Sequence, residues 1–313
     1  VDDWLDLSTG VSPFPWPVPA LPAAAWHRLP EDDDGLVDIA RQYYQAPDLL
    51  PVAGSQAAIQ ALPQLRMTSR VGVLSPGYAE HAHAWRRFGH QVETRTAEEL
   101  LAHPDRHDVI VLIHPNNPGG ERFDIATLLD LNARLARRGG WLVVDEAFID
   151  VTPEASLCAE SARDGLVVLR SVGKFFGMAG ARAGFVCAPR LLLDALRERL
   201  GPWTLSGPSR YALRLALSDR RWQEEARTRL RNAGRQLIET LRESGLRPDG
   251  GCALFQWCRL ADAHALHVAL AQRGILTRLF DAPPSLRFGL PPDAADLCRL
   301  REALAEVRTG AVA

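Results

Sequence analysis

The sequence lacks the features that mark several classes of protein. Its 36 lysines and arginines face 38 aspartates and glutamates, for a net charge of −2 at pH 7, so there is no basic surplus to bind nucleic acid or an anionic membrane. No apolar run is long enough to cross a membrane. The five cysteines form no CxxC pair and are odd in number, which argues against a disulfide framework and a structural zinc site. We therefore expect a cytoplasmic protein with no bound metal and no membrane or nucleic-acid partner.

The beginning of the chain is acidic and unlike a signal peptide. Residue 1 is valine rather than methionine, so we expect further residues before it. Prolines at positions 13, 15, 17, 19, 22 and 30 disfavour regular helix and central strand over residues 1–30. We predict an extended N-terminal arm there.

Short apolar runs alternate with helical patterns between residues 31 and 205. The runs cover residues 71–74, 109–113, 141–144, 167–169 and 183–188. Continuous apolar character is typical of strands buried on both faces, and residues 125–138 have the apolar spacing of an amphipathic crossover helix. The pattern predicts a large α/β domain over residues 31–205, built on a mostly parallel sheet covered by helices.

The pattern changes after Pro202. A helical stretch over 221–244 precedes short strands near 253–257, 275–277 and 286–288, with helices at about 261–273 and 293–307. This succession predicts a smaller α+β domain over residues 206–313, against which the arm can pack.

Lys174 is the most informative residue in the sequence. It lies between two predicted strands, in the glycine-containing run Ser171-Val172-Gly173-Lys174-Phe175-Phe176-Gly177. Lysine side chains are usually surface charges. A lysine held in such a loop can be desolvated, which lowers the pKa of its amine and allows it to form a Schiff base with an aldehyde.

Two polar residues follow predicted strands, at the sheet edge where ligands collect. Asp145 comes directly after the strand 141–144, where its carboxylate needs a cation such as a protonated pyridine nitrogen; a helix cap or a metal ligand is the alternative. Asn117 follows the strand 109–113, and its amide can donate to a phenolate oxygen, although Asn-Pro-Gly alone indicates only a turn. Together with Lys174, these residues indicate pyridoxal phosphate as a cofactor.

Further residues are candidates for binding a phosphate and the face of a ring. Ser55 and Gln56 lie at a predicted helix start, whose free N–H groups suit a phosphate; a plain helix start is the alternative. Ser171 and Arg182 can add a hydroxyl and a guanidinium. Tyr78 follows another strand and can stack on the ring, although a tyrosine there can also serve packing alone.

The order and spacing of these residues resemble those of the fold-type I pyridoxal phosphate enzymes of the aspartate aminotransferase superfamily. The resemblance extends from the arm to Arg287, and it implies a homodimer whose sites are completed by both subunits. It implies these roles: Lys174 as the Schiff-base lysine, Asp145 on the pyridinium, Asn117 on the phenolate, Tyr78 stacked on the ring, and Ser55, Gln56, Ser171 and Arg182 around the phosphate. It also implies that Arg287 binds the α-carboxylate of the substrate.

Several stretches are most similar to the threonine-phosphate decarboxylases of cobalamin biosynthesis. They include residues 75–80, 145–150 and 202–204, and Phe148 stands where most aminotransferases have a tyrosine. The similarity implies decarboxylation of L-threonine O-3-phosphate, with Lys174 as a candidate to protonate Cα. Arg278 is then a candidate for the substrate phosphate, with a surface charge as the alternative.

Three features depart from the family pattern. Leu29 stands where many relatives have a tyrosine that reaches the partner subunit's cofactor phosphate, so we expect that contact to be absent. Gly119 replaces the threonine of Asn-Pro-Thr-Gly. The decarboxylases also carry a His-Gly-Gly arm, which would lie before residue 1.

Other functions stay open from the sequence. Histidinol-phosphate aminotransferase is the nearest rival, and it would depend on glutamate or 2-oxoglutarate. A regulator that senses pyridoxal phosphate is a remote alternative, because the sequence shows no helix-turn-helix segment and no basic patch. A scaffold without catalysis would leave Asp145 and Lys174 close together without a ligand, a costly arrangement unless the two pair directly.

Overall fold

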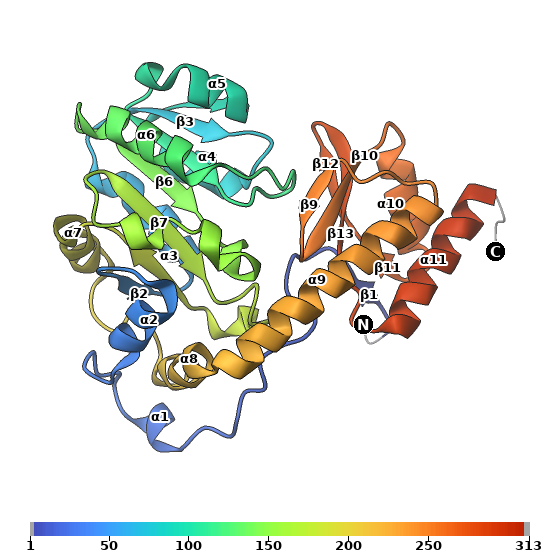
Figure 1. The fold of residues 1–313 in the computed structure, drawn as a ribbon, viewed down its shortest axis with the longest axis horizontal. Helices are drawn as coiled ribbons and strands as arrows, with labels where there is room; N and C mark the ends of the chain where they lie inside the picture. Colours follow the sequence, from blue (N-terminus) through green and yellow to red (C-terminus); the bar gives the residue numbers. More distant parts are fainter. Residues whose placement is uncertain (1–2, 310–313) are drawn as a thin grey trace.

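The structure is a computed structural model that describes residues 3–309, with side chains described up to residue 307. A large α/β part and a smaller part built on a second sheet lie side by side, and the long helix α9 (Arg220–Glu243) runs along both (Figure 1). Within the described residues, no helix combines the length and apolar character needed to cross a membrane.

The large part is built on a seven-stranded sheet. Its strands, in spatial order, are β2 (Leu50–Val52), β8 (Gly184–Cys187), β7 (Leu166–Ser171), β6 (Trp141–Asp145), β5 (Val109–Ile113), β3 (Arg70–Leu74) and β4 (Gln91–Arg95). Strands β4, β3, β5, β6 and β7 are parallel, whereas β8 is antiparallel to both of its neighbours. The predicted mostly parallel α/β sheet is confirmed.

Helices cover both faces of this sheet because its central strands are apolar on both sides. In β5, Val109 and Val111 join one buried cluster with α3, α4 and α7, while Ile110 and Leu112 join the other cluster with α6. Each such side chain contributes about 1.5–3 kcal/mol when fully buried. The helices of this part are α2 (Leu36–Tyr44), α3 (Ser55–Ala61), α4 (Ala79–Arg87), α5 (Ala97–Ala102), α6 (Ile125–Ala136), α7 (Arg190–Leu200) and α8 (Gly207–Ser218).

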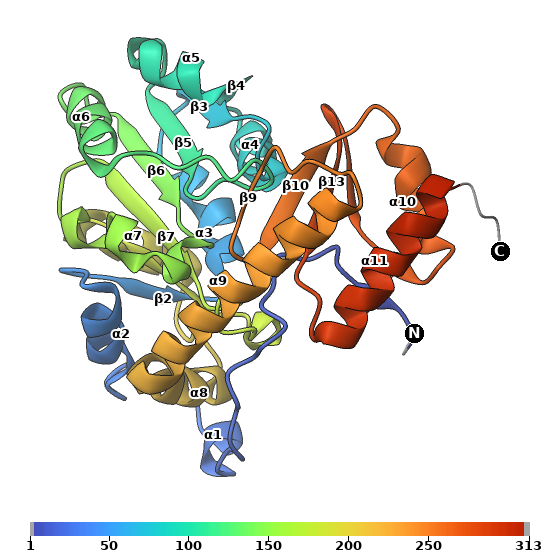
Figure 2. The ribbon, with the colours of Figure 1, turned by 45° about the vertical axis from the view of Figure 1, so that its right-hand side comes forward.

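The smaller part is an antiparallel four-stranded sheet backed by helices, as the two views show (Figure 2). Its strands, in spatial order, are β12 (Arg278–Asp281), β13 (Pro284–Gly289), β10 (Phe255–Arg259) and β9 (Gly250–Cys252), and its helices are α10 (Ala263–Ala271) and α11 (Ala294–Thr309). Leu286 and Phe288 of β13 are fully buried on the helix side. The other face of the sheet presents Arg287 toward the large part.

The N-terminal arm passes between the two parts. Its strand β1 (Leu5–Asp6) pairs in parallel with β11 (Ile275–Leu276), and farther along the backbone nitrogen of Ser12 donates to the carbonyl of Lys174 at 2.9 Å. The expectation of an arm without helix is wrong at one place, where α1 (Ala24–His27) makes a single turn. Residues 23–29 contain no proline, so nothing there removes the donors that a helical turn requires.

Helix α8 contacts α1 and α2, which lie with the large part. Helix α9 contacts the 3-10 helix that follows β6 at one end and β10 and α11 at the other. The sequence pattern predicted that the smaller domain starts at residue 206. We propose that the boundary between the domains lies later, within α9.

Candidate active site

A single pocket lies at the carboxyl ends of the parallel strands. Because β3, β5, β6 and β7 are parallel, the segments that follow them meet at one edge of the sheet. The residues that line the pocket include eight of the ten expected site residues: Ser55, Gln56, Tyr78, Asn117, Asp145, Ser171, Lys174 and Arg182. Arg287 and Arg278 do not line the pocket itself.

Lys174 is held at this pocket by its backbone. Its carbonyl accepts hydrogen bonds from the nitrogens of Ser12 and Gly177, and its Nζ lies 5.5 Å from the centroid of the Phe148 ring. Burial lowers the pKa of the Lys174 amine, and the positive charge of Arg287 lowers it further. A larger fraction of the amine is therefore neutral and able to attack an aldehyde.

Lys174 is also the one lysine among the 313 residues, against 35 arginines. The composition thus contains a signal that the motif-based interpretation did not use. Every other cationic position of the sequence is filled by arginine, so the one lysine is a candidate for chemistry that requires a neutral amine, which a guanidinium cannot supply.

Asp145 is buried at the end of β6, and both of its oxygens have protein partners. Oδ1 accepts from the backbone nitrogen of Ala147 at 3.0 Å, and Oδ2 lies 2.9 Å from Nε2 of His81. Nε2 of His81 can donate this bond, which fixes the orientation of the carboxylate. The sequence interpretation missed His81. A signal was available, because His81 follows Tyr78 by three residues and therefore lies on the same side of the helix.

Arg182 and a glycine form a cradle beside the start of α3. Arg182 has a positive φ of 48°, and its guanidinium lies so close to Gly54 that a Cβ there would sit 3.1 Å from Nη2. The hydroxyl of Ser171 accepts from the nitrogen of Gly173 at 3.3 Å, and Ser55 lines the same end of the pocket. One guanidinium and two hydroxyls are a suitable donor set for a phosphate.

The side chain of Gln56 has two protein partners, and its place near a cofactor phosphate stays a prediction. Its Oε1 accepts from the hydroxyl of Tyr78 at 3.2 Å, and its Nε2 donates to Glu80 at 3.0 Å. These bonds tie the Tyr78 ring to the start of α3. The pKa of the Tyr78 hydroxyl is raised by burial and by the negative charges of Glu80 and Asp145, so it stays protonated as a donor.

Arg287 of the smaller sheet contacts Asn117, which lines the pocket. Its Nη1 donates to Oδ1 of Asn117, and its Nη2 donates to the carbonyl of Ser8. Since Arg287 requires the oxygen of the Asn117 amide, the amide nitrogen remains available to donate to a ligand. Burial lowers the pKa of Arg287 to about 10. Arg278 is exposed and lies beside Arg287 in register on the neighbouring strand.

A buried ionic network lies behind the pocket and was also missed by the sequence interpretation. Arg170 donates to Glu146 at 2.7 Å and to Asp150 at 2.6 Å, and all three side chains are almost completely buried. Glu146 directly follows Asp145, and Arg170 directly precedes Ser171. The network therefore joins the ends of β6 and β7 at the point where they present their site residues.

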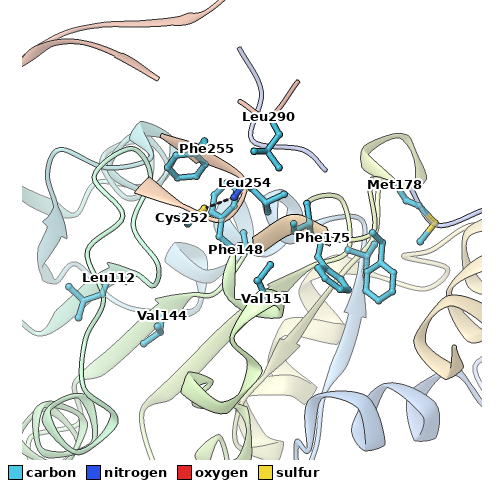
Figure 3. Packing of buried hydrophobic residues seen from close by; sticks show 14 of the residues in the cluster. Leu112, Val144, Phe148, Val151, Phe175, Met178, Cys252, Leu254, Phe255 and Leu290 are labelled. Carbon is cyan, nitrogen blue, oxygen red and sulfur yellow. Dashed lines mark hydrogen bonds between the residues drawn. The ribbon is translucent and has the colours of Figure 1, made fainter. Parts of the chain in front are cut away.

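Phe148 closes the pocket toward the smaller part. Its ring meets Phe255 edge-on, with centroids 5.1 Å apart (Figure 3). Phe148 is buried and belongs to the large part, while Phe255 lies on β10, so the contact joins the two parts next to Lys174.

Together these residues fit pyridoxal phosphate. The cradle at Gly54 and Arg182 suits its phosphate, the anchored carboxylate of Asp145 suits its pyridinium nitrogen, and the free amide nitrogen of Asn117 suits its phenolate. The amine of Lys174 lines the same pocket and can bind its aldehyde.

Comparison with known proteins agrees with this geometry. Residues 36–304 match the family described as aminotransferase class I and II. The chain is 58% identical to the threonine-phosphate decarboxylase of Pseudomonas aeruginosa, over 96% of this chain and 91% of that protein. It is 40% identical to the threonine-phosphate decarboxylase of a Sinorhizobium species, over 98% and 93% of the two chains.

More distant proteins share the fold. The crystal structure of histidinol-phosphate aminotransferase from Clostridium acetobutylicum superposes with a TM-score of 0.87 at 21% identity, covering 98% of this chain and 99% of that one. The chain therefore belongs to the aminotransferase class I and II family and, within it, to the threonine-phosphate decarboxylases.

Proposed function

We propose that this protein is a pyridoxal phosphate-dependent decarboxylase. It converts L-threonine O-3-phosphate to (R)-1-amino-2-propanol O-2-phosphate and carbon dioxide, and the product supplies the aminopropanol linker of cobalamin. The proposal rests on the half-buried amine of Lys174 in one pocket with Asp145, in a chain similar over nearly its whole length to threonine-phosphate decarboxylases. When bound, the cofactor withdraws electrons from the bonds at Cα of the substrate.

The chain's own residues hold the cofactor and manage protons. Asp145, oriented by His81 and by the nitrogen of Ala147, keeps a negative charge ready for the ring nitrogen. Lys174 has a lowered pKa and can return a proton to Cα after the carboxylate has left. Tyr78 lies over the ring position, with its hydroxyl tied to Gln56.

Two arginines of the smaller sheet recognise the substrate in this proposal. Arg287 binds the α-carboxylate in a bidentate manner and holds the bond from Cα to the carboxylate in the reactive orientation. Arg278, beside it in register and exposed, binds the substrate phosphate.

The proposal also includes a cytoplasmic homodimer. Trp26 and Leu29 on the arm each expose 66% of their surface, and a second copy would remove this apolar surface from water. The cysteines of the described residues are all free, which suits a reducing compartment. Sedimentation of the cofactor-loaded protein tests the dimer.

The proposed reaction is tested by following the phosphorus-containing products of L-threonine O-3-phosphate, with and without 2-oxoglutarate. The decarboxylase gives aminopropanol phosphate in both samples at the same rate. Formation of a phosphorylated keto acid only when 2-oxoglutarate is present would instead identify an aminotransferase.

A further inference from the structure

The two candidate substrate arginines belong to one row of residues across the smaller sheet. Arg278 is paired in register with Arg287, Arg287 with Trp257, and Trp257 with Gly250. Neighbouring strands lie about 4.7–4.9 Å apart, so hydrogen bonding between the strands fixes the spacing within the row. The row ends at Gly250, on the edge strand β9.

Gly250 touches the loop that carries Asn117, backbone against backbone. The nitrogen of Gly251 donates to the carbonyl of Gly119 at 3.1 Å. A Cβ placed on Gly250 would overlap that same carbonyl oxygen, and a Cβ on Gly120 would overlap the carbonyl of Gly251. Since every atom in this contact belongs to the backbone, a methyl group can be accommodated only if one of the two segments moves.

The loop is fixed to the large part. Nδ2 of Asn116 donates to the carbonyl of Pro76 at 2.8 Å and to Glu121 at 2.7 Å. Oδ1 of Asn116 accepts from the nitrogen of Asn117 at 2.8 Å. The loop therefore holds the Gly119 carbonyl in place on the large part, and the contact with this carbonyl limits how closely β9 can approach.

We propose that Gly250, seated on Gly119, is a positioning residue for the substrate. It allows β9 to approach the loop closely enough for Arg287 to reach Asn117 and for Arg287 and Arg278 to face the pocket. Gly119 takes part in this contact through its backbone carbonyl. The use of L-threonine O-3-phosphate as the ligand rests on the proposed function.

The test is Gly250→Ala in the cofactor-loaded protein. Gly250 does not have a positive φ, so alanine is compatible with its backbone, and the three atoms nearest to the added methyl group all belong to Gly119. We expect the Kd for L-threonine O-3-phosphate, measured from the spectrum of the bound cofactor, to rise about tenfold or more, which is about 1.4 kcal/mol. The protein should still bind the cofactor, because the phosphate cradle at Gly54 and Arg182 belongs to the large part.

Gly180→Ala is the matched control, because no atom lies within 4 Å of a Cβ at that position and its φ is also not positive. We expect it to leave the Kd unchanged. A Gly250→Ala protein that melts at a lower temperature but binds substrate normally would overturn the proposal, since a purely structural role predicts that result.

A double-mutant cycle with Arg287→Lys tests whether Gly250 acts through the arginine. If Gly250 positions Arg287, the losses in substrate affinity are not additive. An arginine that is already displaced contributes less to substrate binding, so its replacement removes less affinity. Additive losses would overturn the proposal.

Hydrogen exchange in the wild-type protein provides a test that needs no variant. If the glycine contact raises substrate affinity, substrate must stabilise the contact to the same degree. Saturating substrate should therefore slow exchange of the Gly251 amide, and unchanged exchange would overturn the proposal. Wild-type protein that does not bind L-threonine O-3-phosphate would refute the proposed substrate instead, and the variants would then be compared with L-glutamate, whose α-carboxylate needs the same arginine.

Discussion

Nε2 of His81 lies 2.9 Å from Oδ2 of Asp145 inside a site where both side chains are almost completely buried. The contact joins the first turn of α4 to the end of β6. The carboxylate that is proposed to hold the pyridinium nitrogen thus has a fixed orientation before any cofactor binds.

Loss of this contact should slow the reaction without unfolding the protein. In His81→Ala, Asp145 loses one of its two partners, and a hydrogen bond to a charged group contributes about 1.5–3 kcal/mol. We expect kcat to fall about 10- to 100-fold. His81→Gln, which places an amide nitrogen near the position of Nε2, should restore most of the rate; equal rates in the wild-type and alanine proteins would contradict the role of His81.

The single lysine makes the covalent site directly testable. Borohydride reduction of the protein loaded with pyridoxal phosphate should fix the cofactor to one peptide, the one that contains Lys174. Lys174→Ala should yield no labelled internal peptide while keeping its far-ultraviolet circular dichroism. Label on any other internal peptide, or a wild-type protein that takes up no label, would contradict the assignment.

His114 should make the protein sensitive to mild acid. Burial lowers the pKa of His114 to about 4, whereas the unfolded chain has an ordinary histidine pKa of about 6.5. Between these values the unfolded state binds more protons, so this contribution is present at pH 7 and is lost as the pH falls. We expect a loss of about 2 kcal/mol between pH 7 and pH 5.

Urea unfolding at the two pH values measures this effect. His114→Gln keeps an acceptor for the nitrogen of Phe123, to which Nδ1 of His114 is bonded, and removes the titration. Its unfolding free energy should therefore fall by about 2 kcal/mol less than that of the wild type over the same interval. Identical pH slopes in the two proteins would show that His114 does not titrate as its burial predicts.

The network behind the pocket should be important for stability. Arg170→Met leaves Glu146 and Asp150 buried without their cation, and removal of one partner from a buried pair costs about 3–5 kcal/mol. The exposed pair of Arg163 and Glu160 provides the comparison, since Arg163→Ala should cost less than about 1 kcal/mol. Chemical denaturation compares the two variants, and similar small losses in both would rule out a structural role for the buried network.

The central strands of the large sheet could be predicted from sequence because they are largely apolar, whereas the edge strands β2 and β4, of which β4 is mostly exposed, were not predicted. The same parallel arrangement places Asn117, Asp145 and Ser171 at one edge, so their proximity follows from the order of strands alone. Lys174 was found from its glycine-containing loop. These features are local, or depend only on chain order.

Contacts between elements distant in sequence could not be predicted in the same way. The place of His81 three residues after Tyr78 puts the two side chains on the same side of α4, but the contact with Asp145 depends on how α4 packs on the sheet. The contact of Gly119 with Gly250 depends on how the two sheets approach each other. The bonds from the side chain of Gln56 to Tyr78 and Glu80 likewise depend on how α3 and α4 pack together.

The most direct measurement of the central claim is the release of labelled carbon dioxide from carboxyl-labelled L-threonine O-3-phosphate by the cofactor-loaded protein, with no keto acid present. We predict release by the wild type and none by Lys174→Ala. No release by the wild type, together with conversion of histidinol phosphate that requires 2-oxoglutarate, would contradict the account and identify an aminotransferase.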